Sequence, residues 1–350
     1  MNKYILLLFF SGTCGFVFSR QKAGWQHLQQ GPYTVGFATM QATGNKNENL
    51  SIGIWYPASK GGRKMTLRDY IIESKETPTV PDTTALNDCK HVLELPFLYH
   101  LDPIADTDFE KAIGAPFSAF KNAPVQKGKF PLIIAYCLPE SYPETFEYLT
   151  SHGFVVACVT GHLKDAANDT LLYVQATDIL GQLIDIMAKQ PYVDTSLIAG
   201  IGHGWGIQPP FHLAMRTRTI KMLVNMDGGV FGPRSKTTLS PDYNPSQLKI
   251  PMLHLVTQST NAEDDAGQFN ALSNPLYKLL VNSPAVSHHD FSIYGRIVDN
   301  GLHKRGGAAP PVEEVYAIAH KLILYFLLHG KLETIVVPPA LFKFNVYNKK

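Results

Sequence analysis

A glycine-rich turn in the second half of the chain has the framework of a catalytic turn but lacks the reacting side chain. The segment Gly202-His-Gly-Trp-Gly206 directly follows the apolar run Leu197–Ile201. A G-x-?-x-G pattern between a strand and a helix is typical of a sharp turn that pushes its central residue into a crevice, where an enzyme normally carries serine. Here the central residue is Gly204, which has no atom that could attack a substrate.

Asp227 and His288 have the residue types, and the order along the chain, of the acid and base that would serve such a turn. Asp227 directly follows the apolar run 222–226, and His288 precedes Asp290. In a working triad the histidine removes the nucleophile's proton, and the aspartate fixes the histidine tautomer and stabilises the imidazolium. Alone, Asp227 could be a turn residue and His288 a surface histidine beside His289. Their joint order at predicted strand ends favours the triad positions.

A regular alternation of strands and helices is predicted to position these residues. Apolar runs predict strands at 50–57, 130–136, 154–159, 197–201, 222–226 and 252–256, and helical periodicity predicts helices at 144–152, 171–188 and 312–328. This alternation predicts an α/β fold with a mostly parallel central sheet and helices on both faces. Ligands of such sheets bind beyond the carboxyl ends of the strands, where the glycine-rich turn and Asp227 are expected.

Residues 59–126 are less regular, with scattered prolines and the apolar stretch 93–101. We expect an irregular N-terminal insertion with short helices, within a single domain that spans 20–350, and this insertion could cover the crevice as a lid. The polar stretch 257–267 is predicted to be a solvated loop.

Residues 1–19 have the pattern of a secretory signal peptide. Lys3 precedes the apolar run 4–10, and Val17-Phe-Ser19 places acceptable residues at a signal-peptidase site. The apolar core is shorter than the ~20 residues of a spanning helix. We therefore expect cleavage near Ser19, export to the periplasm or the extracellular space, and a mature protein that does not span a membrane.

The composition is that of a globular protein. Of the 350 residues, 45% are hydrophobic and 17% charged, which allows a sizeable core and excludes a disordered chain. The formal net charge is +2 and no run of Lys or Arg exceeds two residues, so no nucleic-acid partner is expected. Four cysteines are too few for a disulfide scaffold. The sequence does not predict the oligomeric state.

The ordered motifs resemble the secreted α/β-hydrolases that include the platelet-activating factor acetylhydrolases and the bacterial dienelactone-hydrolase-like esterases. The resemblance runs through 31–36, 54–58, 130–134, 151–157, 197–206, 227, 288–291 and the closing helix. It implies an α/β-hydrolase fold and the chemistry of carboxylic-ester hydrolases, with Asp227 and His288 as acid and base. Family members carry serine where this chain has Gly204, so the resemblance implies a retained scaffold with impaired or lost acyl chemistry.

The resemblance also locates the backbone donors of an oxyanion hole. Family members usually carry His-Gly or Pro-Gly after the strand that ends here at Tyr136, whereas this chain has Cys137-Leu-Pro139. Since Pro139 has no N–H, Leu138 and Trp205 are the candidate donors.

Aromatic residues around the turn predict the character of the ligand. Tyr136, Tyr142 and His203 are expected to line the pocket beside Trp205, and aromatic walls with few charges favour a small apolar or amphiphilic ligand, such as an ester. Neither cofactor nor metal is expected, because the histidines around the site lack HxxxH or HxH spacing.

Three functions stay open at this point. The first is an exported, non-catalytic or catalytically impaired ligand-binding relative of carboxylic-ester hydrolases. The second is an active carboxylic-ester hydrolase that uses Cys137 or Ser141 as nucleophile, or a water activated by His288. The third is a secreted domain that binds a partner protein.

Overall fold

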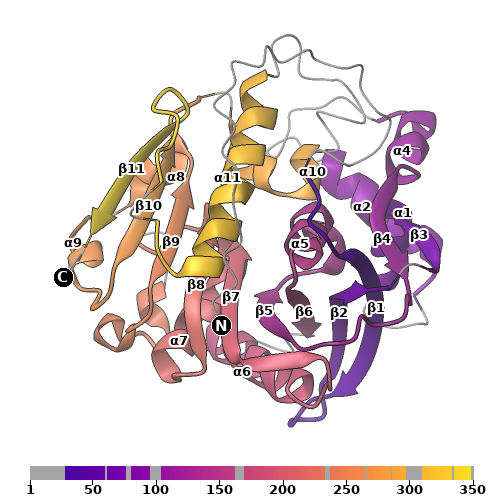
Figure 1. The fold of residues 1–350 in the computed structure, drawn as a ribbon, viewed down its shortest axis with the longest axis horizontal. Coiled ribbons are helices and arrows are strands. Elements are labelled where there is room, and N and C mark those ends of the chain that lie inside the picture. Colours follow the sequence, from indigo (N-terminus) through magenta and orange to yellow (C-terminus); the bar gives the residue numbers. More distant parts are fainter. Residues whose placement is uncertain are drawn as a thin grey trace, which may run out of the picture.

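Eleven strands form one sheet in the order β11-β10-β9-β8-β7-β5-β6-β2-β1-β4-β3 (Figure 1). The structure is a computed structural model that describes residues 28–59, 61–75, 80–94, 104–161, 169–232, 237–264, 266–284, 286–296, 310–332 and 335–347. The expected signal peptide lies outside these residues. The strands are β1 (Thr34–Thr43), β2 (Asn49–Ala58), β3 (Arg63–Thr66), β4 (Pro116–Lys121), β5 (Phe130–Tyr136), β6 (Val155–Gly161), β7 (Val193–His203), β8 (Ile220–Met226), β9 (Met252–Val256), β10 (Leu276–Val281) and β11 (Phe342–Tyr347).

The centre of the sheet is parallel, as the sequence predicts. Strand β5 pairs in parallel with β6 and β7, and the parallel pairing continues through β8 and β9 to β10. Antiparallel pairs occur on either side of this centre, where β2 pairs with β6 and β1, and β11 pairs with β10. Because the central strands run in the same direction, the turns that follow β5, β7, β8 and β9 all emerge at one edge of the sheet.

Helices cover both faces of this sheet, each over its own hydrophobic core. They are α1 (Leu67–Glu73), α2 (Asp82–Glu94), α4 (Asp106–Ile113), α5 (Pro143–Ser151), α6 (Asp169–Met187), α7 (Gln208–Arg216), α8 (Gln258–Glu263), α9 (Ala266–Asn270), α10 (Ile293–Arg296) and α11 (Pro310–His329). Residues of α1, α5 and α11 join one core, and residues of α6 and α7 join the other. Successive residues of β5 alternate between the two cores, as a strand buried on both faces must.

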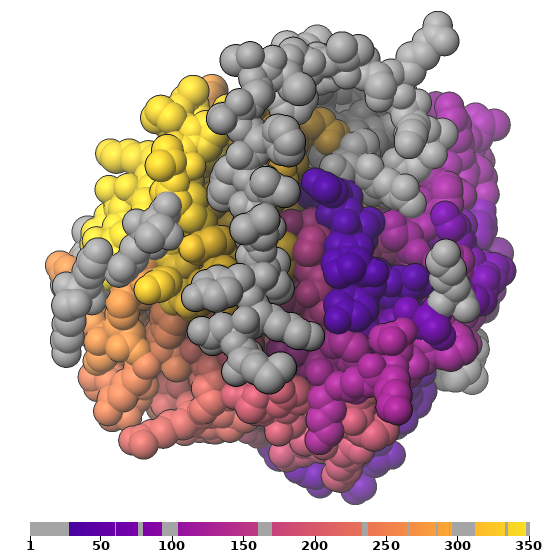
Figure 2. Space-filling model, viewed as in Figure 1, coloured from indigo at the N-terminus to yellow at the C-terminus, as the bar shows by residue number. Residues whose placement is uncertain are grey.

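Residues 59–126 contain the predicted short helices, α1, α2 and α4, and two strands as well. Strand β4 pairs with β1, and β3 pairs with β4 at the end of the sheet. In the space-filling view, the amino-terminal half (indigo to magenta) and the carboxyl-terminal half (orange and yellow) lie on opposite sides of the visible face (Figure 2).

The prediction of a solvated loop at 257–267 is wrong. Helices α8 and α9 lie there, Thr257 is 1% exposed, and the Asp264 side chain is buried against Lys278 and His254. The polar composition misled the prediction because two of these polar residues, Thr257 and Asp264, bond to partners inside the protein, Asp227, His254 and Lys278. No helix within the described segments is both long and apolar enough to cross a membrane.

Candidate functional site

The turn after β7 has the tight geometry that its glycines predict. Strand β7 ends at His203, a short 3-10 turn spans Gly204–Ile207, and α7 follows directly. A Cβ atom on Gly202 would lie 2.5 Å from the carbonyl oxygen of Gly206 and from the backbone of Ile207, so only glycine fits there. Gly204 has φ +55°, a left-handed conformation that favours glycine.

Asp227 and His288 form a hydrogen-bonded pair beside this turn. The imidazole Nδ1 of His288 lies 2.9 Å from Oδ2 of Asp227, which is 1% exposed. Thr257 donates to the same carboxylate from its backbone N–H at 2.5 Å and from its hydroxyl at 3.0 Å. Burial alone would raise the pKa of Asp227, but its hydrogen bond and charge interaction with His288 and the Thr257 N–H lower it below its ordinary value. The carboxylate therefore stays ionised and fixes the proton of His288 on Nδ1.

The free nitrogen of His288 faces the position where a nucleophile would stand. A Cβ atom built on Gly204 would lie 3.1 Å from Nε2 of His288 and 3.2 Å from its Cε1. The structure therefore brings together Gly204, Asp227 and His288, the three residues proposed as triad positions, although they lie far apart in the sequence. The Cβ distances are tight, so a side chain at position 204 would require the imidazole to give way by a few tenths of an ångström.

His203 and Tyr142 hold the backbone of His288 in place. The carbonyl oxygen of His288 can only accept, so His203 donates to it from Nε2 at 2.8 Å and accepts from the Tyr142 hydroxyl at Nδ1, 2.9 Å away. The two imidazole rings stack with centroids 4.1 Å apart. Burial and the neighbouring His288 lower the pKa of His203 to about 3, so the ring is neutral at physiological pH. With both ring nitrogens engaged, His203 has no lone pair for a metal.

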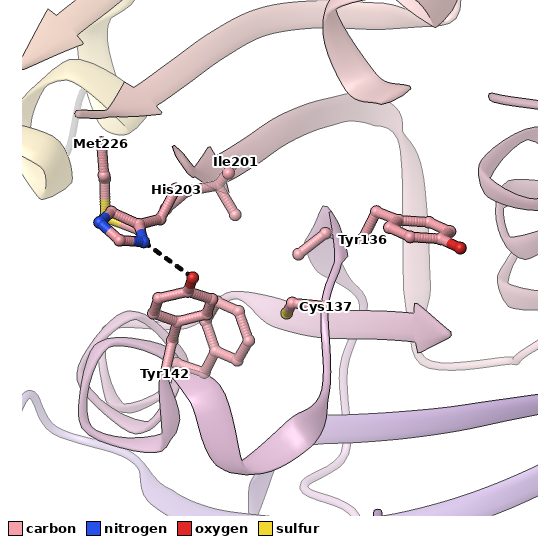
Figure 3. Close-up of a pocket in the computed structure, with 9 residues that line it drawn as sticks. Tyr136, Cys137, Tyr142, Ile201, His203 and Met226 are labelled. Atoms are coloured by element: carbon pink, nitrogen blue, oxygen red, sulfur yellow. Dashed lines mark hydrogen bonds between the residues drawn. The ribbon is translucent and has the colours of Figure 1, made fainter. Parts of the chain in front are cut away.

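The three residues expected to line the pocket surround a void that is too small for a ligand. Figure 3 shows Tyr142 and His203 pointing toward one another while Tyr136 points away from them. Together with Cys137 and neighbouring apolar side chains they enclose a gap without room for a water molecule. Within the described residues, no group of three or more His, Cys, Asp or Glu side chains could hold a metal ion.

Cys137 and Ser141, the alternative nucleophiles, lie on the loop after β5. The Cys137 thiol neighbours Cys158 and Glu140, and burial together with these groups raises its pKa well above its ordinary value. Such a thiol is rarely ionised and is a poor nucleophile. Ser141 is buried in a short 3-10 turn, where its N–H donates to the Leu138 carbonyl. Among the hydrogen bonds of the described residues, none joins either side chain to His288.

The candidate oxyanion donors follow neighbouring strands. Leu138 lies after β5 and Trp205 after β7, and these strands pair directly. Trp205 occupies the first turn of a helical segment, where backbone N–H groups have no partner within the helix. Trp205 is 37% exposed, and its indole stacks on Tyr173 with centroids 6.0 Å apart and meets Tyr136 edge-on at 5.6 Å. An aromatic surface thus adjoins position 204.

Sequence reasoning missed Thr257, the residue that anchors Asp227 from the next strand. Its signal was present, because Thr257 directly follows β9 at the edge of the sheet where Asp227 follows β8. The pairing of Tyr142 with His203 had no such signal, since the two residues lie 61 positions apart.

Comparison with known proteins establishes the fold. Neither a protein-family model nor a curated protein sequence matches the chain. Among solved structures, a ferulic acid esterase from Streptomyces cinnamoneus superposes on 89% of this chain and 96% of its own, with a TM-score of 0.62 and 15% sequence identity. This likeness and the sheet described above give the chain an α/β-hydrolase fold, as the sequence predicts. At this identity the likeness extends to the fold alone.

Proposed function

We propose that this protein is a ligand-binding member of the α/β-hydrolase fold that keeps an esterase's acid–base pair without performing serine-dependent acyl transfer. The observation that carries the proposal is the position of Gly204, whose Cβ direction points at Nε2 of His288. The hydrogen-bonded pair Asp227–His288, which could activate a serine, lies beside a position that has no side chain. Removing the serine of such a triad typically lowers kcat by ~10⁶.

The aromatic surface beside position 204 supports a small apolar or amphiphilic ligand. Trp205 is one of the few large hydrophobic side chains in the described chain that are substantially exposed, and Tyr173 and Tyr136 hold it in place. Aromatic faces bind flat apolar groups by stacking. The solved neighbour is named for ferulic acid, an aromatic acid, so aromatic esters are the first ligands to test.

Restoring the nucleophile tests the assignment of the site. Gly204→Ser and Gly204→Ala add the same Cβ atom, and only the serine adds an oxygen. We expect the original protein and Gly204→Ala to be inert toward a fluorophosphonate probe, and Gly204→Ser to label covalently. Labelling should be lost again in Gly204→Ser/His288→Ala. Failure of Gly204→Ser to label while it remains folded would contradict the proposed site.

Direct hydrolysis by water is a second candidate function. The His288 side chain is 35% exposed and its Nε2 faces the open position at Gly204, so it could remove a proton from a water molecule. Hydrolysis of p-nitrophenyl acetate or ethyl ferulate by the unmodified protein, abolished by His288→Ala and without a covalent adduct, would favour this function over non-catalytic binding. Equal background rates in both proteins would exclude it.

We further propose that the protein is exported after cleavage near Ser19. The support is the charged start, the short apolar core and the small residue at the predicted cleavage site. Mass spectrometry of protein expressed from the full-length gene tests this. A mature chain that begins at Arg20 is expected, and a retained Met1 in the purified protein would contradict the proposal.

A further inference from the structure

A row of polar side chains crosses the sheet beside the turn that carries Asp227. Asn225 in β8, His254 in β9 and Lys278 in β10 are register partners across three neighbouring parallel strands. Asn225 and His254 are fully buried, and Lys278 is 5% exposed. Parallel strands buried on both faces normally carry apolar residues at such positions, so this row requires an explanation.

Hydrogen bonds link the members of the row, and Asp264 joins His254 to Lys278 as its fourth member. The Asn225 amide nitrogen lies 2.7 Å from Nδ1 of His254, and Nε2 of His254 lies 3.1 Å from Oδ2 of Asp264, which follows α8. Lys278 donates to the same Asp264 oxygen at 2.5 Å. The row therefore ends in a buried ion pair whose charges compensate one another.

At the other end of the row, Asn225 bonds to the backbone of the turn that carries Asp227. The Asn225 side-chain oxygen accepts from the Gly228 N–H at 2.7 Å, and its nitrogen donates to the Gly228 carbonyl at 2.7 Å. Gly228 follows Asp227, whose φ of +54° is unfavourable for a residue other than glycine. A Cβ on Gly228 would lie 2.6 Å from the Gly204 carbonyl oxygen, so this turn also contacts the turn at position 204.

These bonds fix the orientation of both the amide and the imidazole. Because the Gly228 N–H must face an acceptor, the Asn225 oxygen lies there and its NH₂ group faces His254. His254 then accepts at Nδ1 and carries its proton on Nε2, which donates to Asp264. The carboxylate of Asp264, paired with Lys278, thereby places the His254 proton on Nε2 and leaves Nδ1 as the acceptor that Asn225 requires.

We infer that the row Asn225–His254–Asp264–Lys278 is a positioning device that holds the left-handed turn at Asp227, and thereby keeps Asp227 and His288 aligned with position 204. Stability alone does not account for it, since replacing buried ionic groups by well-packed apolar residues is often neutral or stabilising. The inference rests on the proposed site, because it assigns these four residues to the geometry of its acid–base pair.

Two substitutions of His254 separate positioning from packing. His254→Asn keeps an acceptor near the place of Nδ1 for Asn225, whereas His254→Leu fills similar space without one. The readout is the low-field proton resonance of His288 Nδ1–H in the unmodified Gly204 background. We expect its exchange with solvent to accelerate at least tenfold in His254→Leu and less than threefold in His254→Asn. Tyr70→Phe, which removes a buried hydrogen bond between Tyr70 of α1 and Glu147 of α5, serves as the control for general destabilisation.

The result that overturns the inference is an unchanged His288 resonance in His254→Leu, or equal acceleration in His254→Leu and Tyr70→Phe at matched stability. If His254→Leu does not fold, Asn225→Asp is used instead, because it keeps the shape and the acceptor for Gly228 while losing both donors. This readout requires no turnover. Fluorophosphonate labelling of Gly204→Ser tests the proposed function separately, so an intact His254 effect without labelling would contradict that function alone.

Discussion

Gly204 and Asp227 have nearly the same positive φ angle, but one has no side chain and the other has a carboxylate. They follow neighbouring parallel strands, β7 and β8, with φ values of +55° and +54°. At Gly204 the residue is glycine, and no strain is stored. At Asp227 a side chain is kept in a conformation that costs about 1–3 kcal/mol. The comparison shows two ways in which this fold keeps a residue at positive φ. The residue can be a glycine, or hydrogen bonds to its side chain can offset the strain.

The bonds at Asp227 explain how that strain is sustained. Its carboxylate accepts from Thr257 and His288, and Asn225 holds the following residue. The other described non-glycine residues with positive φ are Asn47 and Asn122, and asparagine tolerates this conformation well. Asp227 differs from them because it is buried and its carboxylate is held by hydrogen bonds to Thr257 and His288.

The largest effect expected from this comparison is at Asp227. Asp227→Ala should lower the free energy of unfolding by about 3 kcal/mol, because it breaks a buried pair and leaves the Thr257 N–H unsatisfied. Asp227→Gly removes the same bonds but relieves the backbone, so it should lose about 1 kcal/mol less. Urea denaturation of both variants measures the difference. Equal losses would show that the turn at Asp227 is not strained.

Acidification should affect the Gly204 side of the site first. The folded pKa of His203 is about 3 against an ordinary 6.5, so below pH 6.5 the unfolded chain binds a proton that the folded protein does not. The stability from neutral His203 is therefore full above pH 6.5 and is lost as the pH falls. Between pH 7.5 and 5, the original protein should lose about 2 kcal/mol relative to His203→Phe.

Urea denaturation of the two proteins at both pH values checks this prediction. Phenylalanine keeps a ring against His288 and cannot titrate, and all other ionisable groups are common to both proteins. A stability difference that does not change with pH would mean that His203 is not held neutral by its burial.

Much of the fold could be predicted because its central strands are apolar runs between helices of clear periodicity. The runs at 130–136 and 252–256 coincide with β5 and β9, and the run at 222–226 makes up the last five residues of β8. The peripheral strands were missed for identifiable reasons. In β10, Lys278 interrupts the apolar pattern; it can be buried there because it forms an ion pair with Asp264, a residue of another segment. In β11, partly exposed polar residues alternate with aromatic ones.

The residues of the candidate site that directly follow strands could be predicted from the sequence. The residues that hold them in place by hydrogen bonds could not. Gly204 and Asp227 follow apolar runs directly, and the order of His288 after them restricts the choice. Thr257 lies in a stretch whose polar composition predicts a solvated loop, although its side chain bonds to Asp227. The role of Tyr142 depends on its contact with His203, 61 residues away in the sequence. Local sequence encodes where a strand ends, whereas the partners of a side chain are set by the packing of the whole fold.

Adding a side chain at Gly204 tests whether that turn becomes strained as the turn at Asp227 is. Gly204→Ala should lower the free energy of unfolding by about 1–2 kcal/mol, because φ is positive and nothing bonds to the new methyl group. The methyl would also press on Nε2 of His288, 3.1 Å away. Gly229→Ala is the matched control, since a Cβ there meets no atom within 4 Å. Urea denaturation measures the free energy of unfolding of both variants. If Gly204→Ala loses no more than Gly229→Ala, a side chain at position 204 does not strain the backbone.

The smallest expected effect concerns Tyr142, which supports the Gly204 side as Thr257 supports the Asp227 side. Tyr142→Phe removes the hydroxyl that donates to His203, and should lower the free energy of unfolding by about 1 kcal/mol. Tyr56→Phe removes a buried hydroxyl bonded to the Ala123 carbonyl at 2.8 Å, and should lose a similar amount. Only Tyr142→Phe should shift the imidazole resonances of His203 and His288 in an NMR spectrum. If both variants leave those resonances unchanged, Tyr142 contributes to packing alone, and the histidine at position 288 depends on the aspartate side for its placement.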